Sequence, residues 1–526
     1  MIESATFPFP GKWLGGSNWE IFMDRRDFLR GSTAVGALAV AAKPTLALAG
    51  TDPFVRMDGM AQADLVRRGE VSSLELVDAA ISRIEKLNPK INAVVHTRFE
   101  KARALAASGD IPDGPFTGVP YLIKDLSELE GEPHTFGSNL FAGNVADRDN
   151  GSVQRSKAAG LVILGKTNTP EFGLLATTES ELLGAAHNPW DLARHTGGSS
   201  GGAAAAVASG MVPFAHASDG GGSIRIPASI CGLVGLKPSR GRPYALPDEG
   251  MAGDISVRLA VTRSVRDTAQ ALNVTERKEG EGTLSPVGFV EGPSTRRLKI
   301  GVSTLNYAGN DASSDVKAAI NASAKLCADL GHEIVETKPF LNGDEFLENF
   351  MGIWASSPAY LVDNAWLIGL TQFRWTNAEE GLEPWTRGLA EWFEKQEAAK
   401  PGVVERSLAY FERVTREYDD YFKTFDVELT PVLRTPPILL GTQSPDVAFE
   451  QLFERVLDYV SYTPQHNVAG TPAITLPLFT SAEGLPVGSQ FATKVGGERT
   501  LIELAYELEA ALPWAGRWAP NSAAYL

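Results

Sequence analysis

The spacing of apolar residues predicts an amphipathic helix early in the chain. Four apolar residues recur at intervals of three or four and therefore share one helical face. They are Leu74, Val77, Ile81 and Ile84. Ser72 and Glu75 have the spacing of a capping box at the start of this helix, and Pro89 is expected just beyond its end. A shorter helix is expected before it, at residues 58–68, because Gly69 breaks the pattern.

Short apolar runs bounded by Gly or Pro predict buried strands. They occur at residues 119–123, 161–164, 298–302, 332–335, 427–429, 473–476 and 487–492. Helical patterns lie between several of these runs, and two further helices are expected at 315–330 and 501–511. Alternating helices and strands indicate an α/β fold, with a mixed or parallel sheet covered by helices on both faces.

The second half of the chain holds two segments of different composition. Residues 276–297 are polar and rich in Gly, Glu and Pro, which indicates a surface connection. Residues 340–425 contain five of the ten tryptophans. Such aromatic residues more often pack in a core than contact a ligand, so this segment is first interpreted as packing.

Two glycine-rich turns at residues 196–227 are the most informative stretch. Each turn holds a serine, and a short helix at 203–209 joins them. Glycine lets adjacent backbone N–H groups converge on one point, which creates a site for an anion or an oxyanion. Pro227 suits the first turn of a following helix. A flexible linker is the alternative, but linkers are not usually followed by an Ala/Val helix and a second, different glycine turn.

These turns resemble the signature of the amidase signature family, hydrolases of carboxamides and related acyl bonds. The resemblance spans about residues 55–515 and is carried by several motifs. They are Val119 to Leu126, Gly198 to Gly202, Gly222 to Arg225, Gly232 to Pro238, Arg263 to Asp267 and Asn467 to Ile474. One departure is Gly220, where many members have Thr. The resemblance implies one large α/β unit at residues 50–526, a mixed sheet with helices on both faces, and an insertion at about 340–425 that borders the substrate entrance.

The resemblance also assigns roles to residues. It implies a triad of Lys124, Ser199 joined by a cis peptide, and Ser223 as the nucleophile. The oxyanion hole would use backbone N–H groups of Gly220, Gly221, Gly222 and Ser223. Asp219, Arg225 and Gly173 are expected to support the site, the first two by bracing the turn through hydrogen bonds.

A lysine base must be neutral to accept a proton, although its ordinary pKa is about 10.4. Burial disfavours the ammonium and can lower that pKa by up to about 3–5 units. Lys124 follows an apolar strand, which makes burial plausible. As the resemblance implies, Lys124 would deprotonate Ser199, Ser199 would deprotonate Ser223, and Ser223 would form an acyl-enzyme. Within the family the chain is most similar to amidases of the nylon-oligomer (cyclic amide dimer) kind, so linear or cyclic amides are expected, with carbamates or esters as the alternative.

Charge and composition limit the partners. Lys and Arg number 48 against 64 Asp and Glu, a net charge of −16, so nucleic acid and anionic membranes are unlikely partners. The two cysteines and seven histidines lack metal-ligand spacing, and neither a metal nor a cofactor is expected. The expected partner is a small-molecule substrate, and the sequence leaves monomer and homodimer open.

The first 49 residues resemble a twin-arginine export signal. Arg25 and Arg26 precede an apolar run at 34–42, which is shorter than the roughly 18 residues of a membrane span. Small residues end at Ala49, where cleavage is expected. The sequence therefore predicts a periplasmic or secreted protein whose translation starts at Met23.

Two other interpretations remain open. Residues 197–201 match the Gly-x-Ser-x-Gly nucleophile elbow, which would make Ser199 the nucleophile with Asp426 and His466 as partners. The chain could instead be an accessory subunit of a tRNA-dependent amidation complex, although its acidic charge and export signal argue against that role.

Overall fold

The computed structural model describes residues 52–526 except 247–248, 250–254 and 372–377. The chain divides into Met1–Asp52 and Pro53–Leu526, and the structure below is that of the second unit. The expected export signal, the cleavage site at Ala49 and the start at Met23 lie outside the described residues.

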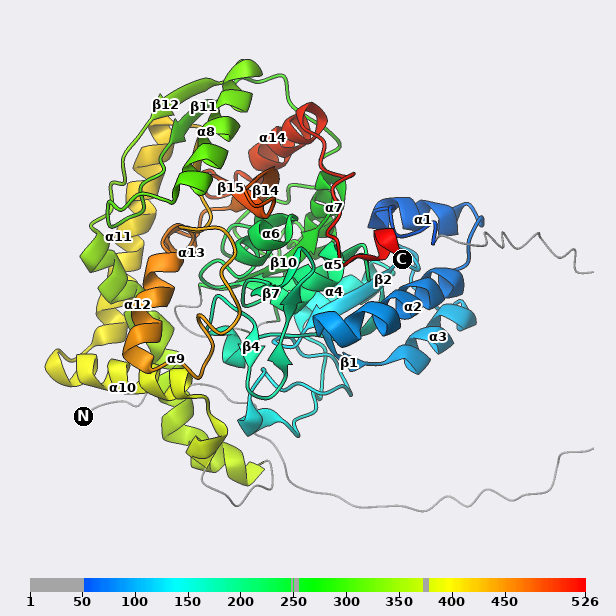
Figure 1. Cartoon of the computed structure of the whole chain (residues 1–526), viewed down its shortest axis with the longest axis horizontal. Helices are drawn as coiled ribbons and strands as arrows, with labels where there is room; N and C mark the ends of the chain where they lie inside the picture. The colour runs from blue at the N-terminus through cyan, green and yellow to red at the C-terminus, as the bar shows by residue number, and fades with distance from the viewer. Residues whose placement is uncertain (1–51, 247–248, 250–254, 372–377) are drawn as a thin grey trace, which may run out of the picture. The chain divides into compact units, whose positions relative to one another are not determined.

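Two mixed sheets form the centre of this unit (Figure 1). The larger has eight strands in the order β12-β11-β13-β15-β14-β9-β10-β8. In that order the strands are Glu333–Glu336, Lys299–Val302, Val427–Pro431, Pro486–Ala492, Ala473–Thr480, Val234–Lys237, Val257–Thr262 and Phe214–Asp219. The smaller has the order β1-β3-β2, formed by Val94–Thr97, Val162–Thr167 and Pro120–Lys124. Only the β11–β12, β11–β13 and β2–β3 pairs within these two sheets are parallel. Strand β2 lies against β8, so the two sheets meet there.

Helices cover both faces of the larger sheet. Successive side chains of a strand point to opposite faces. In β15, Gly488 packs against Ser229 of α6 (Arg225–Cys231), and its N–H donates to the Ser229 hydroxyl over 2.9 Å. The next residue, Ser489, shares a 2.7 Å hydrogen bond with Ser323 of α8 (Ser314–Asp329). Helices α6 and α8 therefore lie on opposite faces, as the α/β fold with a doubly covered mixed sheet requires.

The remaining helices surround this core. Near the smaller sheet lie α2 (Ser73–Ile91), α3 (Phe99–Ser108) and α5 (Gly201–Ala208), while α7 (Val265–Thr275) and α14 (Glu498–Ala511) pack together. Helices α1 (Gly59–Arg67), α4 (Gly151–Ala158) and α13 (Pro464–Val468) are short. Most predicted strands and helices are therefore confirmed, with boundaries that differ by a few residues.

The aromatic-rich segment forms a second, helical layer. It consists of α9 (Gly343–Thr371), α10 (Pro384–Ala399) and α11 (Val403–Thr424), joined by α12 (Phe449–Tyr459) from later in the chain. These helices lie together beside the sheet (Figure 1). They enclose their own apolar core, which includes Phe346, Trp385 and Phe411. The expectation that the tryptophans serve packing is thus met by Trp385, whereas Trp366 is exposed.

One predicted helix boundary is wrong. The capping box forms, because the Ser72 hydroxyl accepts from the Glu75 N–H and the Glu75 carboxylate accepts from the Ser72 N–H. Pro89, however, lies inside α2, which continues to Ile91. Proline lacks the N–H that would donate to the Glu85 carbonyl, and the helix continues for only two residues beyond it. The Asn88 side chain then accepts from the N–H groups of Ala93 and Val94, which ends the helix.

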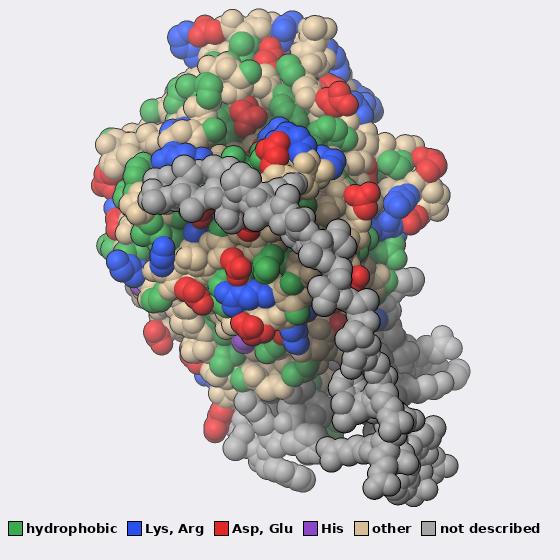
Figure 2. Space-filling model, turned by 90° about the vertical axis from the view of Figure 1, so that its right-hand side faces the viewer, with side chains coloured by type: hydrophobic (Ala, Val, Ile, Leu, Met, Phe, Trp, Pro, Cys, Tyr) green, Lys and Arg blue, Asp and Glu red, His purple; other side chains and the backbone are tan. Residues whose placement is uncertain are grey.

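The surface of the described part carries both signs of charge. On the face shown in Figure 2, acidic and basic side chains are interspersed rather than segregated. Among the residues described, no helix combines the length and the apolar character that crossing a membrane requires.

Candidate active site

Lys124 is the last residue of β2 and is completely buried. Its Nζ lies 2.6 Å from the Ser199 Oγ and 3.0 Å from the Ser218 Oγ. Burial lowers the pKa of the Lys124 ammonium well below its ordinary value; the negative charge of Asp219 opposes this shift and the positive charge of Arg258 adds to it. The predicted burial of Lys124 beside Ser199 is confirmed.

Ser199 lies in the first glycine turn, and the Gly198–Ser199 peptide is cis. Helix α5 begins two residues later and holds the turn against the β8 side of the core. The neighbouring Ser200 hydroxyl accepts from the Ser218 N–H at 3.3 Å, which ties the turn to β8. The expected cis geometry at Ser199 is therefore present.

Gly173 packs directly against this turn. It has a φ of +73°, and a Cβ added there would lie 3.0 Å from the Ser199 Oγ and 2.7 Å from Leu126 Cδ1. Both its conformation and its closeness to Ser199 therefore favour glycine. The structure brings Gly173 to the site, as expected for a supporting residue.

The second glycine turn connects β8 to α6 and carries Ser223. The Asp219 carboxylate accepts from the Gly222 N–H at 2.8 Å and from the Ile224 N–H at 3.2 Å. The expectation that Gly222 donates to an oxyanion is therefore wrong, since its N–H is already bonded. Within the described chain, the N–H groups of Gly220, Gly221 and Ser223 donate to no acceptor, so these three are the candidate oxyanion donors.

Arg225 anchors this turn to distant parts of the chain. A guanidinium has five N–H donors, and the structure supplies acceptors for all of them. They are both carboxylate oxygens of Asp219, the Asn467 and Gln490 side chains, and the Thr463 carbonyl. Burial alone would raise the pKa of Asp219, but the Arg225 charge and the hydrogen bonds hold it below its ordinary value. The expected bracing role of Asp219 and Arg225 matches these contacts.

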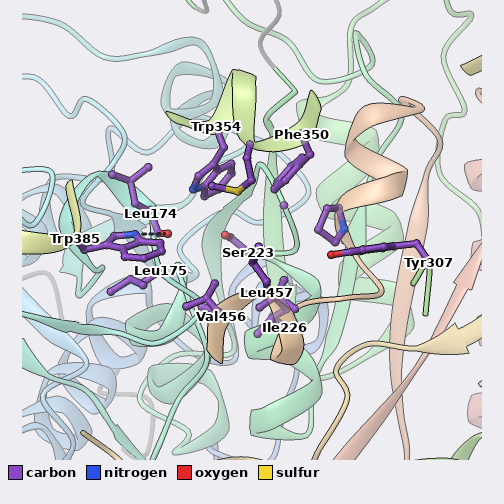
Figure 3. Close-up of a pocket in the computed structure, with 17 residues that line it drawn as sticks. Leu174, Leu175, Ser223, Ile226, Tyr307, Phe350, Trp354, Trp385, Val456 and Leu457 are labelled. Atoms are coloured by element: carbon purple, nitrogen blue, oxygen red, sulfur yellow. Dashed lines mark hydrogen bonds between the residues drawn. The ribbon is translucent and has the colours of Figure 1, made fainter. Parts of the chain in front are cut away.

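Ser223 faces a pocket of about 580 Å³ of empty space that opens to solvent. One wall of the pocket is the segment Gly173 to Ala176. The others come from α6, from the helical layer and from the loop that holds Tyr307. The lining residues include Leu174, Leu175, Ile226, Tyr307, Phe350, Met351, Trp354, Trp385, Val456 and Leu457. Figure 3 shows Ser223 among these side chains. The expectation that the aromatic-rich segment borders the substrate entrance agrees with this lining.

Sequence reasoning missed three polar residues around Lys124. Ser218 binds its Nζ, as described above. Asp125 and Lys166, both fully shielded from solvent, form an ion pair of 2.6 Å that joins the ends of β2 and β3. The Lys166 Nζ also donates to the Pro133 carbonyl at 2.8 Å. Asp125 could have been found from the sequence, because it is a charged residue directly after a buried strand. No sequence pattern distinguishes Ser218 or Lys166.

The nucleophile-elbow interpretation fails on geometry. Asp426 accepts from the Lys299 N–H at 2.9 Å and pairs with Arg296, not with His466. His466 contacts the Thr471 hydroxyl at 3.1 Å and faces Glu428. Ser199, His466 and Asp426 therefore form no triad.

Comparisons with known proteins agree with this architecture. The chain matches the family described as Amidase over residues 75–502. The 6-aminohexanoate-cyclic-dimer hydrolase of Paenarthrobacter ureafaciens is 38% identical over 493 residues, covering 88% of this chain and 96% of the relative. A solved structure of 6-aminohexanoate cyclic dimer hydrolase complexed with substrate is 34% identical, with a TM-score of 0.80 over 89% of this chain and 99% of that one. A bacterial aryl acylamidase structure is 25% identical, with a TM-score of 0.77 over 89% and 100% of the two chains.

The fold and the relatives define the class of protein as an enzyme that hydrolyses amides. The chain belongs to the amidase signature family. The predicted α/β fold of that family and the resemblance to hydrolases of cyclic amide dimers are both confirmed.

Proposed function

We propose that the chain is a serine amidohydrolase that works through Ser223, Ser199 and Lys124. The observation that carries the proposal is the 2.6 Å contact between the buried Lys124 Nζ and the Ser199 Oγ, beside a pocket that exposes Ser223. A serine hydroxyl needs a base within hydrogen-bond reach, and a desolvated lysine can be that base.

In the proposed reaction, neutral Lys124 accepts the Ser199 proton while Ser199 accepts the Ser223 proton. The Ser223 Oγ then bonds to the carbonyl carbon. The N–H groups of Gly220, Gly221 and Ser223 stabilise the negative oxygen, for which each lost donor typically costs about 10²–10³-fold in rate. The C–N bond breaks as the relay returns the proton to the amine. Water then attacks the acyl-enzyme by the same relay and releases the acid.

The proposed substrates are linear or cyclic amides. The relative that is named for a cyclic amide dimer supports amides, because it aligns with this chain over nearly its whole length. Carbamates and esters have acyl bonds that the same groups could cleave, so they belong in the same substrate screen. Activity of the purified single chain would argue against an accessory role in a larger complex.

Covalent labelling tests the assignment of the nucleophile. We expect a fluorophosphonate probe to modify Ser223, as located by peptide mass mapping. Ser223→Ala should lose both labelling and turnover, while Ser199→Ala should slow turnover and keep the nucleophile. Ser209→Ala is a matched control, because Ser209 is a buried serine whose hydroxyl donates to the Ala206 carbonyl of α5, away from the pocket. Labelling of Ser199, or turnover by Ser223→Ala, would contradict the proposal.

A further inference from the structure

The part of the pocket wall at Ser223 that the structure describes is uncharged. Among the lining residues that the structure describes, none is Asp, Glu, Lys, Arg or His. Tyr307 is the one lining phenol in that set, and burial raises its pKa to about 12, which keeps it neutral. Figure 3 shows apolar side chains on both sides of Ser223, with Trp385 and Leu174 on one side and Phe350 and Tyr307 on the other.

Two aromatic rings of α9 cover the glycine turn itself. Phe350 and Trp354 are one helical turn apart, and their rings stack at 5.4 Å. A Cβ added to Gly221 would lie 3.3 Å from the Phe350 ring and 3.5 Å from the Trp354 ring. The two rings therefore pack close to Gly221, one of the proposed oxyanion donors. They leave little room there for the hydration shell of an ion.

Across the pocket from Phe350, the indole N–H of Trp385 already donates a hydrogen bond within the protein. The Trp385 Nε1–H donates to the Leu174 carbonyl at 3.2 Å, so this indole presents its apolar surface to the pocket. The two charged residues of the second glycine turn are engaged with each other, since Arg225 has acceptors for all its donors and Asp219 is bonded to it. A charged substrate group inside this pocket would thus meet no side chain of opposite charge among the described lining residues.

We infer that this site selects amides that carry no charge on either side of the scissile bond, and rejects amides bearing a free ammonium or carboxylate on either side. The inference rests on the proposed function, because it takes Ser223 as the point of attack. An unpaired ion in an apolar site is strongly disfavoured, whereas burial of apolar surface is favourable. Cyclic amides and amides between apolar chains fit this requirement, and linear amides of ω-amino acids with free ends do not.

A matched substrate series tests the inference on the wild-type protein. The parent is N-hexylhexanamide, and four derivatives carry an ammonium or a carboxylate at the far end of either chain. We expect the kcat/KM of each charged derivative to be roughly 100-fold lower than that of the parent, as for an unpaired polar group in an apolar site. A charged derivative on either side with a kcat/KM within threefold of the parent would overturn the inference.

Charged variants of the pocket wall provide a reciprocal test. Leu457 lines the pocket and is only partly buried, so it can carry a charge. We expect Leu457→Lys to raise the kcat/KM of a carboxylate derivative and Leu457→Glu to raise that of an ammonium derivative. Leu439→Lys and Leu439→Glu are controls, because Leu439 is 52% exposed and does not line the pocket. Equal responses of both derivatives to both Leu457 variants would contradict the inference.

The two proposals fail in different ways. Probe labelling of Ser223 reports the proposed nucleophile whatever the substrate preference. Normal labelling together with equal turnover of all five amides would overturn the charge selection alone. Undiminished turnover of the parent amide by Ser223→Ala would instead overturn the proposed function.

Discussion

Individual charges in the site differ in how completely they are paired. Arg225 is surrounded by acceptors, and its ion pair with Asp219 orients the turn that carries Ser223. Lys124, in contrast, contacts the hydroxyls of Ser199 and Ser218 and forms no ion pair with another residue that the structure describes. Arg225 therefore holds the structure of the turn, whereas burial lowers the pKa of Lys124 and lets it lose its proton.

Replacement of Asp219 tests its bracing role. Asp219→Asn leaves Arg225 buried with a weaker partner, and breaking a buried pair typically costs about 3–5 kcal/mol. The variant should lower the free energy of unfolding in urea and reduce probe labelling of Ser223. Asp329→Asn is the control, because Asp329 forms an exposed pair with Lys325. Unchanged stability and labelling of Asp219→Asn would show that the turn does not depend on this carboxylate.

At this scale the sequence identified the residues that lie in motifs. Lys124, Ser199 and Ser223 could be placed by resemblance, and the structure brings Lys124 and Ser199 into contact. Ser218 could not be found, because only the packing of β8 against β2 brings it to Lys124. The bonded state of the Gly222 N–H also depends on the fold of the turn, which composition does not specify.

At the scale of secondary-structure elements, the buried carboxyl group of Glu171 joins α10 to the segment that begins the pocket wall at Gly173. Glu171 accepts from the Ser138 hydroxyl at 2.6 Å, from the Glu383 N–H at 2.9 Å, and from the Thr386 hydroxyl. Glu383 and Thr386 flank Trp385 at the start of α10, and Trp385 lines the pocket. Burial raises the pKa of Glu171 to about 7, although these hydrogen bonds oppose the shift.

This carboxyl makes stability depend on pH. Its folded pKa of about 7 exceeds the ordinary 4.5, so the folded state binds more protons between these values. The contribution of Glu171 to stability is present below about pH 4.5 and is lost as pH rises through about 7. Glu171→Gln should therefore weaken the fall of Tm between pH 5 and about pH 8.

Thermal melts across that pH range check this prediction. The fall should be weakened rather than removed, because burial also raises the pKa of Glu383 to about 8. Glu391→Gln is the control, because Glu391 is an exposed residue of the same helix. A Tm profile of Glu171→Gln parallel to that of the wild type would show that Glu171 is ionised throughout.

The sequence predicted these elements unevenly. Strands such as β2 and β3 were visible because they are short, apolar and bounded by Gly or Pro. Helices α9 to α11 were recognised only as one aromatic-rich segment, since their apolar residues face several neighbours rather than a single core. Pro89 was misjudged because the local bonds from the Ala93 and Val94 N–H groups to the Asn88 side chain end α2 beyond the proline, and the proline alone does not indicate them.

In the molecule as a whole, the site is assembled from distant parts of the chain. Lys124 and Ser223 lie in the first half, while Asn467 and Gln490, which hold Arg225, lie near the C-terminus. The pocket walls add α9, α10 and α12 from the helical layer. This arrangement explains why resemblance along most of the chain was needed to predict one α/β unit, since no single segment contains the site.

We propose that residues 1–49 direct export by the twin-arginine route. The proposal depends on Arg25 and Arg26, the apolar run after them and the small residues before Ala49. Replacement of both arginines by lysine should keep the protein in the cytoplasm, as measured by cell fractionation. N-terminal sequencing of the wild-type protein should find a chain that begins near residue 50. A mature protein that keeps Arg25 and Arg26 and is found only in the cytoplasm would contradict this proposal.

The most direct test of the account is the pH dependence of kcat/KM for wild type, Lys124→Ala and Lys124→Arg on one neutral amide. Because Lys124 must be neutral to accept a proton, wild-type activity should rise with pH through one ionisation and reach a plateau well before the ordinary lysine pKa of about 10.4. Both variants should lose most activity and that ionisation, since a guanidinium stays protonated in proteins. Near-normal activity of Lys124→Arg would contradict the account, because it would show that Lys124 contributes only positive charge.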